Sequence, residues 1–170
     1  MTRTRRAFLA GIAPALATLA VAPVALAKPS PQDLVNQVAV ANMFCIESAT
    51  LALKQSSSSA IKDYAHRLAD DHATIASSLR RIIARRSDIA LPDRPDTRHL
   101  DLLRDLGALQ GGDFDKAYVE AQRGTHHTLS LLLEAYARDG EDPELKAFAA
   151  DAFPRFKALE QKAQELPLSP

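Results

Sequence analysis

The sequence predicts an all-α protein, organised as a bundle of four long helices. Two observations support this prediction. Apolar residues recur at intervals of three and four over four long segments, which is the spacing of one helix face. No segment shows the convincing apolar–polar alternation that marks a half-buried strand. We therefore expect helices that meet along their apolar faces around one core.

The first helix is expected over residues 31–55. Ser30 is a good N-cap, and Pro31 suits the first helical position because its missing N–H has no intrahelical partner there. Asp33 places a negative charge at the positive end of the helix dipole. The serine run at 56–59 then interrupts the helical pattern and separates this helix from the next.

The second helix is expected over residues 59–86, with a histidine inside its apolar stripe. The longest connection of the chain follows at 87–97 and contains two prolines. A short helix is expected after it, over 98–109. The stripe of the second helix consists of Ile61, Tyr64, Ala65, Leu68, His72, Ile75, Leu79, Ile82 and Ile83.

The third and fourth long helices are expected near 114–138 and from 143 to the end of the apolar pattern. Asp113 is a candidate N-cap for the third helix, and Gly140 fits a C-terminal stop. Asp142 can cap the fourth helix, with a proline at its first position and an acidic residue in its first turn. Short turns join the outer helix pairs, and one long connection joins the pairs to each other. This order favours a ferritin-like four-helix bundle whose long crossover connection carries a short extra helix.

The N-terminal 27 residues have the pattern of a secretory signal. A positive head precedes an apolar run that ends in Ala25-Leu26-Ala27, a small-x-small cleavage pattern. The segment Thr4-Arg5-Arg6-Ala7-Phe8-Leu9 also resembles the twin-arginine motif, which directs export in the folded state. We expect residues 1–27 to be a cleaved signal peptide and residues 28–170 to form a single bundle domain in the periplasm.

Composition excludes several classes of partner and stabilising bond. The full chain has 21 basic and 21 acidic residues, and the predicted leader holds three of the basic ones, so the mature chain would carry a charge near −3. This balance, together with the absence of tryptophan, gives no reason to expect nucleic acid as a partner. Cys45 is the only cysteine, so an internal disulfide cannot form.

Several segments, in this order and spacing, resemble a known family. They are Phe44-Cys-Ile-Glu-Ser-Ala-Thr-Leu-Ala52, Ile61-Lys-Asp-Tyr-Ala65 with Asp71-His72, Gly112-Asp-Phe-Asp-Lys-Ala-Tyr118 with His126, and Leu145-Lys-Ala-Phe-Ala149 with Pro154. The sequence resembles a ferritin-like domain-of-unknown-function family of exported bacterial proteins, often labelled as outer membrane proteins. The resemblance implies an all-α bundle in the periplasm and no settled activity. That family often has Glu where this chain has Cys45 and His where it has Leu159, so an inherited metal site is in doubt.

The chain lacks the ligand pattern of a standard di-iron bundle. Such a centre takes a Glu-x-x-His pair from each of two helices, and this sequence contains no Glu-x-x-His. The chain does contain two similar pairs in which the shorter Asp replaces Glu. They are Asp63-x-x-His66 and Asp96-x-x-His99. Nucleophile elbows, phosphate loops and nucleotide fingerprints are also absent from the sequence. These observations favour a non-enzymatic protein without a bound cofactor.

His72 is the residue that most invites a functional reading. A histidine within an apolar stripe needs partners for its ring nitrogens. In the structural interpretation, which we favour, it bonds to a polar group of a neighbouring helix such as Glu47 or Thr125. Cys45 lies in the middle of a helix among apolar residues, which favours a packing role for its thiol.

The alternative interpretation is a weak transition-metal site, with His72, His126 and Glu47 as the leading ligands. His127 and Cys45 are further candidates, and this set of N, O and S donors suits zinc or copper. Because consecutive helical residues diverge by about 100°, at most one of the neighbouring pair His126 and His127 can face the core. The sequence thus leaves two hypotheses open: an exported bundle with a binding role in the envelope or in stress, and a metal-binding or redox bundle with a degenerate interior site.

A cluster of arginines near the end of the second helix suggests a surface role. Cations favour the C-terminal end of a helix dipole, so a solvated helix end is the simpler interpretation. Contact with an envelope component or with anionic lipid head groups is the alternative. The cluster consists of Arg80, Arg81, Arg85 and Arg86.

Overall fold

The computed structural model describes residues 28–166, and over this range the chain is entirely helical. Its five helices are α1 (Pro31–Gln55), α2 (Ser59–Ile83), α3 (Thr97–Gly107), α4 (Gly111–Asp139) and α5 (Pro143–Glu165). No strand occurs within the described range, so the all-α prediction is confirmed. The predicted leader, residues 1–27, lies outside the described residues, and its cleavage and the export of the chain stay predictions.

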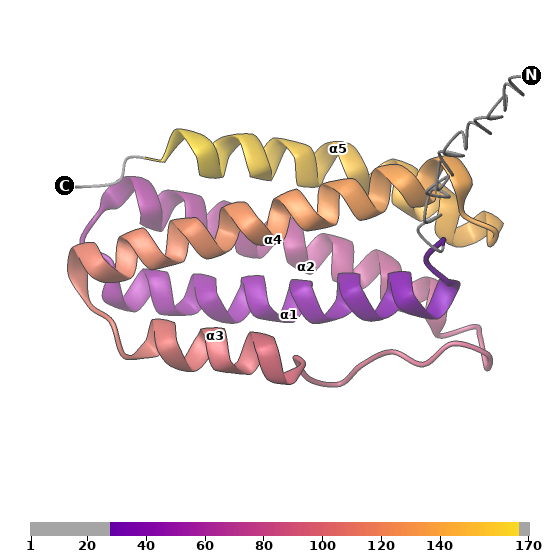
Figure 1. The fold of residues 1–170 in the computed structure, drawn as a ribbon, viewed down its shortest axis with the longest axis horizontal. Coiled ribbons are helices and arrows are strands. Elements are labelled where there is room, and N and C mark those ends of the chain that lie inside the picture. Colours follow the sequence, from indigo (N-terminus) through magenta and orange to yellow (C-terminus); the bar gives the residue numbers. More distant parts are fainter. Residues whose placement is uncertain (1–27, 167–170) are drawn as a thin grey trace, which may run out of the picture.

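The four long helices lie side by side as a helical bundle (Figure 1). The most extensive contacts join α1 to α2 and α4 to α5, the two pairs connected by short turns. Helix α1 also packs on α4, and α2 on α5. The long connection after α2 leads to α3, which covers the outer side of α1 and also touches α4. The apolar faces of the four long helices therefore converge on one interior.

Two helix starts follow the capping chemistry predicted for them. At α1, the backbone N–H of Asp33 donates to Ser30 Oγ at 3.1 Å, and the backbone N–H of Ser30 donates to Asp33 Oδ2 at 3.2 Å. This reciprocal capping box satisfies two backbone donors that the helix itself cannot satisfy. At α5, the N–H of Leu145 donates to Asp142 Oδ1 at 2.9 Å. Both starts are therefore determined by local sequence.

Two boundaries of the long helices lie three residues from their predicted positions, whereas α3 spans Thr97–Gly107 instead of 98–109. Helix α2 ends at Ile83, three residues early, because the chain tightens there: the N–H of Arg86 donates to the Ile83 carbonyl at 2.9 Å, a bond that spans three residues. Helix α4 begins at Gly111 rather than after Asp113. Gly111 has a φ of 57°, which glycine adopts at little cost, and it lets the helix start before the predicted cap. Asp113 instead lies in the first turn, where it complements the helix dipole.

Gly140 ends α4 for a steric reason. The predicted stop corresponds to a left-handed glycine, but Gly140 has a φ of −60° and an extended backbone. A Cβ atom at this position would collide with the ring and the carbonyl oxygen of Tyr136. The glycine is therefore required by the close approach of the Tyr136 side chain and not by backbone conformation.

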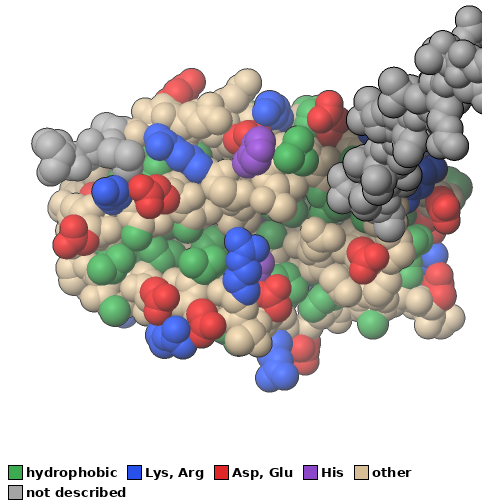
Figure 2. Space-filling view, in the orientation of Figure 1, with side chains coloured by type: hydrophobic (Ala, Val, Ile, Leu, Met, Phe, Trp, Pro, Cys, Tyr) green, Lys and Arg blue, Asp and Glu red, His purple; other side chains and the backbone are tan. Residues whose placement is uncertain are grey.

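Most charged side chains lie at the surface of the bundle, and most of the interior is apolar. On the face shown in Figure 2, acidic and basic side chains are interspersed, in agreement with the balanced composition. Helix α1 is long and apolar enough to resemble a membrane-spanning helix, yet most of its apolar segment is buried inside the bundle. The largest fully buried side chains include Tyr118, Tyr136, Phe44, Phe114, Phe156, Leu34, Ile61, Leu68 and His72.

Asp142 should contribute measurably to stability, because it caps α5 and also accepts a hydrogen bond from the Arg86 guanidinium. We expect Asp142→Ala to lower the free energy of unfolding by about 1–2 kcal/mol. Urea unfolding followed by circular dichroism measures this loss. Asp139→Ala is the matched control, since Asp139 is more exposed and pairs only with its neighbour Arg138. Equal effects of the two substitutions would contradict the assigned role of the cap.

Candidate metal centre

Six buried polar side chains meet in the middle of the bundle, where apolar residues would be expected. They come from three of the four long helices, and each is at most 1% exposed. Burying so many polar groups is costly unless they bond to one another or to a ligand. The six residues are Asn42, Cys45 and Ser48 on α1, His72 on α2, and Gln122 and His126 on α4.

Helix periodicity brings these residues together on their own helices. Asn42, Cys45 and Ser48 are three residues apart, and Gln122 and His126 are four apart, so each set lies on one helix face. Helix α1 contacts both α2 and α4, and helix α5 also contacts both. Helices α2 and α4 therefore face each other diagonally across the core. The histidines of α2 and α4 consequently meet near the bundle axis.

The two histidine rings approach edge to face with their Nε2 atoms toward each other. His72 Nε2 and His126 Nε2 are 3.1 Å apart, and the ring planes are inclined by 69°. Phe156 of α5 packs against both rings, with centroid distances of 5.2 Å to His72 and 6.1 Å to His126. Phe156 is fully buried, so it closes this side of the cluster to water.

The outer ring nitrogens are each bonded to an oxygen. His126 Nδ1 lies 2.7 Å from the backbone carbonyl oxygen of Gln122, and His72 Nδ1 lies 2.6 Å from Asn42 Oδ1. Oxygens of this kind only accept, so both Nδ1 atoms donate. A neutral imidazole that donates from Nδ1 carries a free lone pair on Nε2. With the Asn42 amide in this orientation, the Nε2 lone pairs of both rings point into the same region between α2 and α4.

Cys45 supplies a third donor atom beside the histidines. The cysteine Sγ donates to Gln122 Oε1 at 3.4 Å, and Gln122 Nε2 donates to Ser48 Oγ at 2.9 Å. The ligand atoms of Cys45, His72 and His126 all lie within 4.8 Å of one another, and all three residues are buried. Two imidazoles and one thiol thus form a compact N, N, S cluster.

Burial holds all three donors in their neutral forms. Desolvation lowers the pKa of His72 well below its usual value, and the neighbouring His126 lowers it further. Desolvation likewise lowers the pKa of His126 to about 4, opposed by its bond to the Gln122 carbonyl and by Glu160. Desolvation raises the pKa of the Cys45 thiol. At neutral pH the histidines are therefore uncharged, which is the state that binds metal ions, whereas the thiol must lose a proton to do so.

These pKa values predict a loss of stability in mild acid. In the unfolded chain both histidines titrate near pH 6.5, so below that pH the unfolded state takes up protons that the folded state does not. The metal-free protein should therefore lose about 2 kcal/mol of unfolding free energy through His126 alone between pH 7 and pH 5. Urea unfolding at the two pH values measures this change. His126→Gln should remove this part of the pH dependence, and a flat slope in the unmodified chain would contradict the prediction.

The structure brings together two of the three leading sequence candidates. His72 and His126 form the centre of the cluster, whereas Glu47 lies exposed on another face of α1 and is not part of it. Of the neighbouring histidines His126 faces the core and His127 does not, which agrees with the prediction that at most one of them can. His127 is at the surface, where its Nδ1 lies 2.9 Å from Glu160 Oε1.

The sequence interpretation was incomplete for three residues of the cluster. They are Cys45, Asn42 and Gln122. Cys45 is buried, as the favoured packing role implied, but it also belongs to the donor cluster. The partners of His72 are Asn42 and His126, not Glu47 or Thr125. A signal for Asn42 and Gln122 does exist in the sequence. Each is a polar residue that repeats at three or four residues from a candidate ligand, within an otherwise apolar face.

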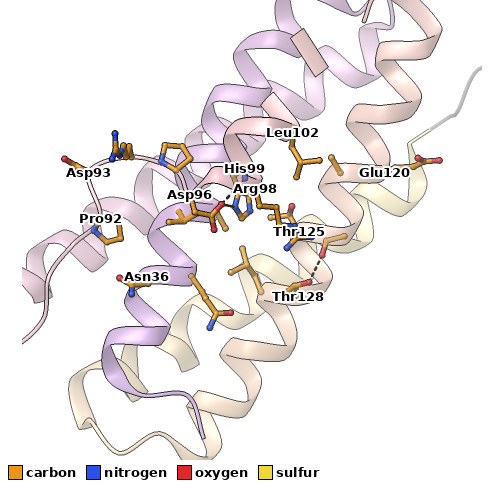
Figure 3. A pocket seen from close by; sticks show the side chains of 18 of the residues that line it. Asn36, Pro92, Asp93, Asp96, Arg98, His99, Leu102, Glu120, Thr125 and Thr128 are labelled. Atoms are coloured by element: carbon orange, nitrogen blue, oxygen red, sulfur yellow. Dashed lines mark hydrogen bonds and ion pairs between the residues drawn. The ribbon is translucent and has the colours of Figure 1, made fainter. Parts of the chain in front are cut away.

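A separate groove lies between α1, α3, α4 and the connection before α3 (Figure 3). Its volume is about 970 Å³, and its lining includes His99, whose Nδ1 lies 2.7 Å from Asp96 Oδ1. The ring of His99 packs on Phe44, next to Cys45 in sequence. The Asp96-x-x-His99 motif therefore builds a helix start and a groove wall, since the N–H of His99 also donates to Asp96.

The arginine cluster is divided by the fold. Arg85 pairs with Glu144, and Arg86 pairs with Asp88 and Asp142, so these two cations tie the end of α2 to the start of α5. Arg80 and Arg81 lie exposed in the last turn of α2. An envelope component or lipid surface as a partner of this cluster stays a prediction.

The fold and the cluster define a helical-bundle protein with buried N and S donors at its centre. The chain belongs to the family described as "Domain of unknown function (DUF4142)", whose model matches residues 16–166. No curated protein sequence matches the chain significantly.

Two solved structures of the protein CopM share this fold. The Cu(II)-bound form of CopM has 15% sequence identity and a TM-score of 0.65, and the match covers 79% of this chain and 93% of CopM. The Cu(I)-bound form has 15% identity and a TM-score of 0.66, and the match covers 80% and 94% of the two chains. At this identity the likeness establishes a common fold alone.

Proposed function

We propose that this protein binds one soft transition-metal ion, copper in the first place, at Cys45, His72 and His126 in the core of its bundle. The observation that carries the proposal is the approach of two buried imidazole Nε2 atoms to 3.1 Å beside a buried cysteine. Thiolate and imidazole ligands together suit copper and zinc.

The spacing of the donors is close to what such an ion needs. With metal–nitrogen bonds of about 2.0–2.1 Å, two imidazole nitrogens on one ion lie about 3.3–3.6 Å apart in tetrahedral or trigonal geometry. The observed separation of 3.1 Å therefore needs to widen by only a few tenths of an ångström. Both Nδ1 atoms already donate to oxygens, the arrangement in which outer partners orient metal-binding histidines.

Charge and donor number favour monovalent copper over zinc. One thiolate and two neutral imidazoles hold a charge of −1, which Cu(I) neutralises, whereas a divalent ion leaves a net positive charge in a dry core. Glu160 is the carboxylate that acts on His126, but it is already paired with Lys157 and His127. Zinc also prefers four ligands, and the cluster supplies three.

The comparison with CopM supports copper as the ion to test first. Structures with the same fold hold copper in both oxidation states, so a bundle of this kind is compatible with copper binding. The ferritin-like description of the fold belongs to this proposal as well, since the long connection between the two helix pairs is the feature that motivates it. The proposal treats the protein as a binding protein rather than an enzyme.

We place this binding in the periplasm. The support is the leader-like sequence of residues 1–27, with its apolar run, small-x-small end and twin-arginine-like motif. Export in the folded state would carry an ion that had been bound before transport. A fusion of residues 1–27 to a reporter, with and without Arg5→Lys and Arg6→Lys, tests this route. Export unaffected by the substitutions would exclude the twin-arginine pathway.

Titration with Cu(I) in the presence of a competing chelator tests the binding site. We expect about one ion per chain. His126→Gln should weaken binding by about 100-fold or more, because it removes a donor. His127→Gln is the matched control, since it removes the neighbouring histidine that faces solvent. Absence of binding by the unmodified chain, or equal binding by the two variants, would overturn the proposal.

A further inference from the structure

The histidine pair cannot form a hydrogen bond in the proton arrangement described above. When both Nδ1 atoms donate outward, both Nε2 atoms are acceptors, and two acceptors 3.1 Å apart repel each other. A third proton on the pair would place a positive charge in a core where Asn42, Gln122 and Phe156 offer no opposite charge. Without a cation between the rings, this arrangement is unfavourable.

A half-turn of the Asn42 amide group removes the repulsion between the two Nε2 acceptors, and the heavy atoms of both histidine rings stay where they are. The amide Nδ2 then faces His72 Nδ1 and donates to it. His72 carries its proton on Nε2 and donates to His126 Nε2 over the observed 3.1 Å, a normal hydrogen-bond length. His126 continues to donate to the Gln122 carbonyl. Every ring nitrogen of the pair then has a compatible partner.

The surroundings of Asn42 permit both orientations. Asn42 is 1% exposed, and its Nδ2 atom has no hydrogen-bond partner within the described residues. A half-turn exchanges this unpartnered nitrogen for the oxygen, so no other bond has to break. After the half-turn, the Asn42 Nδ2 group donates to His72 Nδ1, so it gains an acceptor. Asn42 can therefore act as donor or as acceptor toward His72 at little structural cost.

We propose that Asn42 is a positioning residue that switches the tautomer of His72 with occupancy of the core site. In the metal-free protein the Asn42 amide nitrogen donates to Nδ1, and the His72 proton lies on Nε2, between the rings. When an ion is bound, the Asn42 oxygen accepts from Nδ1–H, and the His72 Nε2 lone pair is free to coordinate. The inference rests on the proposed function, because it concerns the same three ligands.

The switch gives the empty site a closed hydrogen-bond chain and the filled site an oriented ligand. The chain runs from Asn42 through His72 and His126 to the carbonyl of Gln122, and it links α1, α2 and α4. Loading moves one proton within His72 and removes one from Cys45. One proton per ion should therefore be released to solvent, from the thiol alone.

Nitrogen-15 NMR of the histidine rings tests the switch directly. In the metal-free chain we expect His72 as the Nε2–H tautomer and His126 as the Nδ1–H tautomer. After addition of one equivalent of Cu(I), both should be Nδ1–H tautomers with shifted Nε2 signals. A tautomer change of this kind does not follow from a merely structural role of Asn42.

Two substitutions separate the donor and acceptor roles of Asn42. An ionised Asp in Asn42→Asp can only accept, so it should keep a proton on His72 Nδ1 even without metal. Asn42→Leu removes both roles, and it should weaken Cu(I) binding by about 10–100-fold, as loss of an outer partner of a metal ligand does. Asn36→Asp is the matched control, since it makes the same change six residues earlier on α1, where the side chain is bonded to Gln32 instead.

The outcomes distinguish failure of the switch from failure of the function. Binding of Cu(I) with His72 in the Nδ1–H form in both states would overturn the switch and leave the proposed function intact. Failure of the unmodified chain to bind Cu(I) would overturn both. The tautomers of the unmodified chain are the primary measurement, and they support or overturn the switch by themselves.

Discussion

Replacing Cys45 with serine should abolish tight binding of Cu(I) while the bundle remains folded. The substitution removes the only thiolate that can neutralise the ion in the dry core, because Cys45 is the only cysteine of the chain. A serine hydroxyl has nearly the same size and can still donate to Gln122 Oε1, the present partner of Sγ. We therefore expect Cu(I) affinity to fall by more than about 100-fold. Chelator competition measures the affinity, and circular dichroism verifies the fold.

Met43→Leu is the control for this experiment. Met43 lies two residues before Cys45 on α1 and carries the other sulfur atom of the described residues. It lies outside the donor cluster, so its loss should leave the affinity unchanged. If Cys45→Ser retained full affinity, the thiolate would not be a ligand. If Met43→Leu lost it, the ion would bind through the thioether instead.

Replacing Gln122 with glutamate should shift the preference of the core site from Cu(I) toward Zn(II). Gln122 Oε1 lies 3.4 Å from Cys45 Sγ, so a carboxylate there would add a fourth donor beside the other three. It would also bring the ligand charge to −2, which a divalent ion neutralises. Both changes meet the requirements of zinc. We expect the ratio of Zn(II) to Cu(I) affinity to rise by about 100-fold or more relative to the unmodified chain, a free-energy difference of about 2.7 kcal/mol.

Paired titrations with Zn(II) and Cu(I) measure this ratio. The control is Gln55→Glu, which makes the same change on a side chain of α1 that bonds to the carbonyl of Gly107, away from the donor cluster. It should leave the ratio unchanged. An unaltered ratio in Gln122→Glu would mean that net charge and donor number do not decide which ion the site holds.

Local sequence accounts for most of the fold. The caps at Ser30 and Asp142, the apolar stripes and the prolines act within a few residues, so they determine helix positions without tertiary information. The misplaced boundaries share a physical cause. At Ile83 the chain tightens into a shorter turn, and at Gly111 a glycine starts the helix without a side-chain cap. Both are backbone adjustments that the pattern of apolar residues does not encode.

The candidate site was only partly predictable, and the reason is geometric. Positions on one helix can be related by its periodicity: Glu47 follows Cys45 by two residues, about 200° around the helix, so the two cannot both face the core. This relation allows only one of the two residues to join His72 and His126, and it does not say which. The partner of His72 depends instead on the axial positions of α1, α2 and α4 relative to one another. Those positions result from side-chain packing along the whole bundle.

The sequence by itself determined that the chain is helical, where its long helices lie, that His72 lies in an apolar stripe, and that at most one histidine of the pair at 126–127 can face the interior. Periodicity and capping are local properties, and a single segment expresses them fully. Only the tertiary structure decided that His72 and His126 meet at 3.1 Å, that Cys45 completes the cluster and bonds to Gln122, and that Asn42 orients His72. Such contacts join residues 30 to 77 positions apart, and packing between helices alone sets their distances.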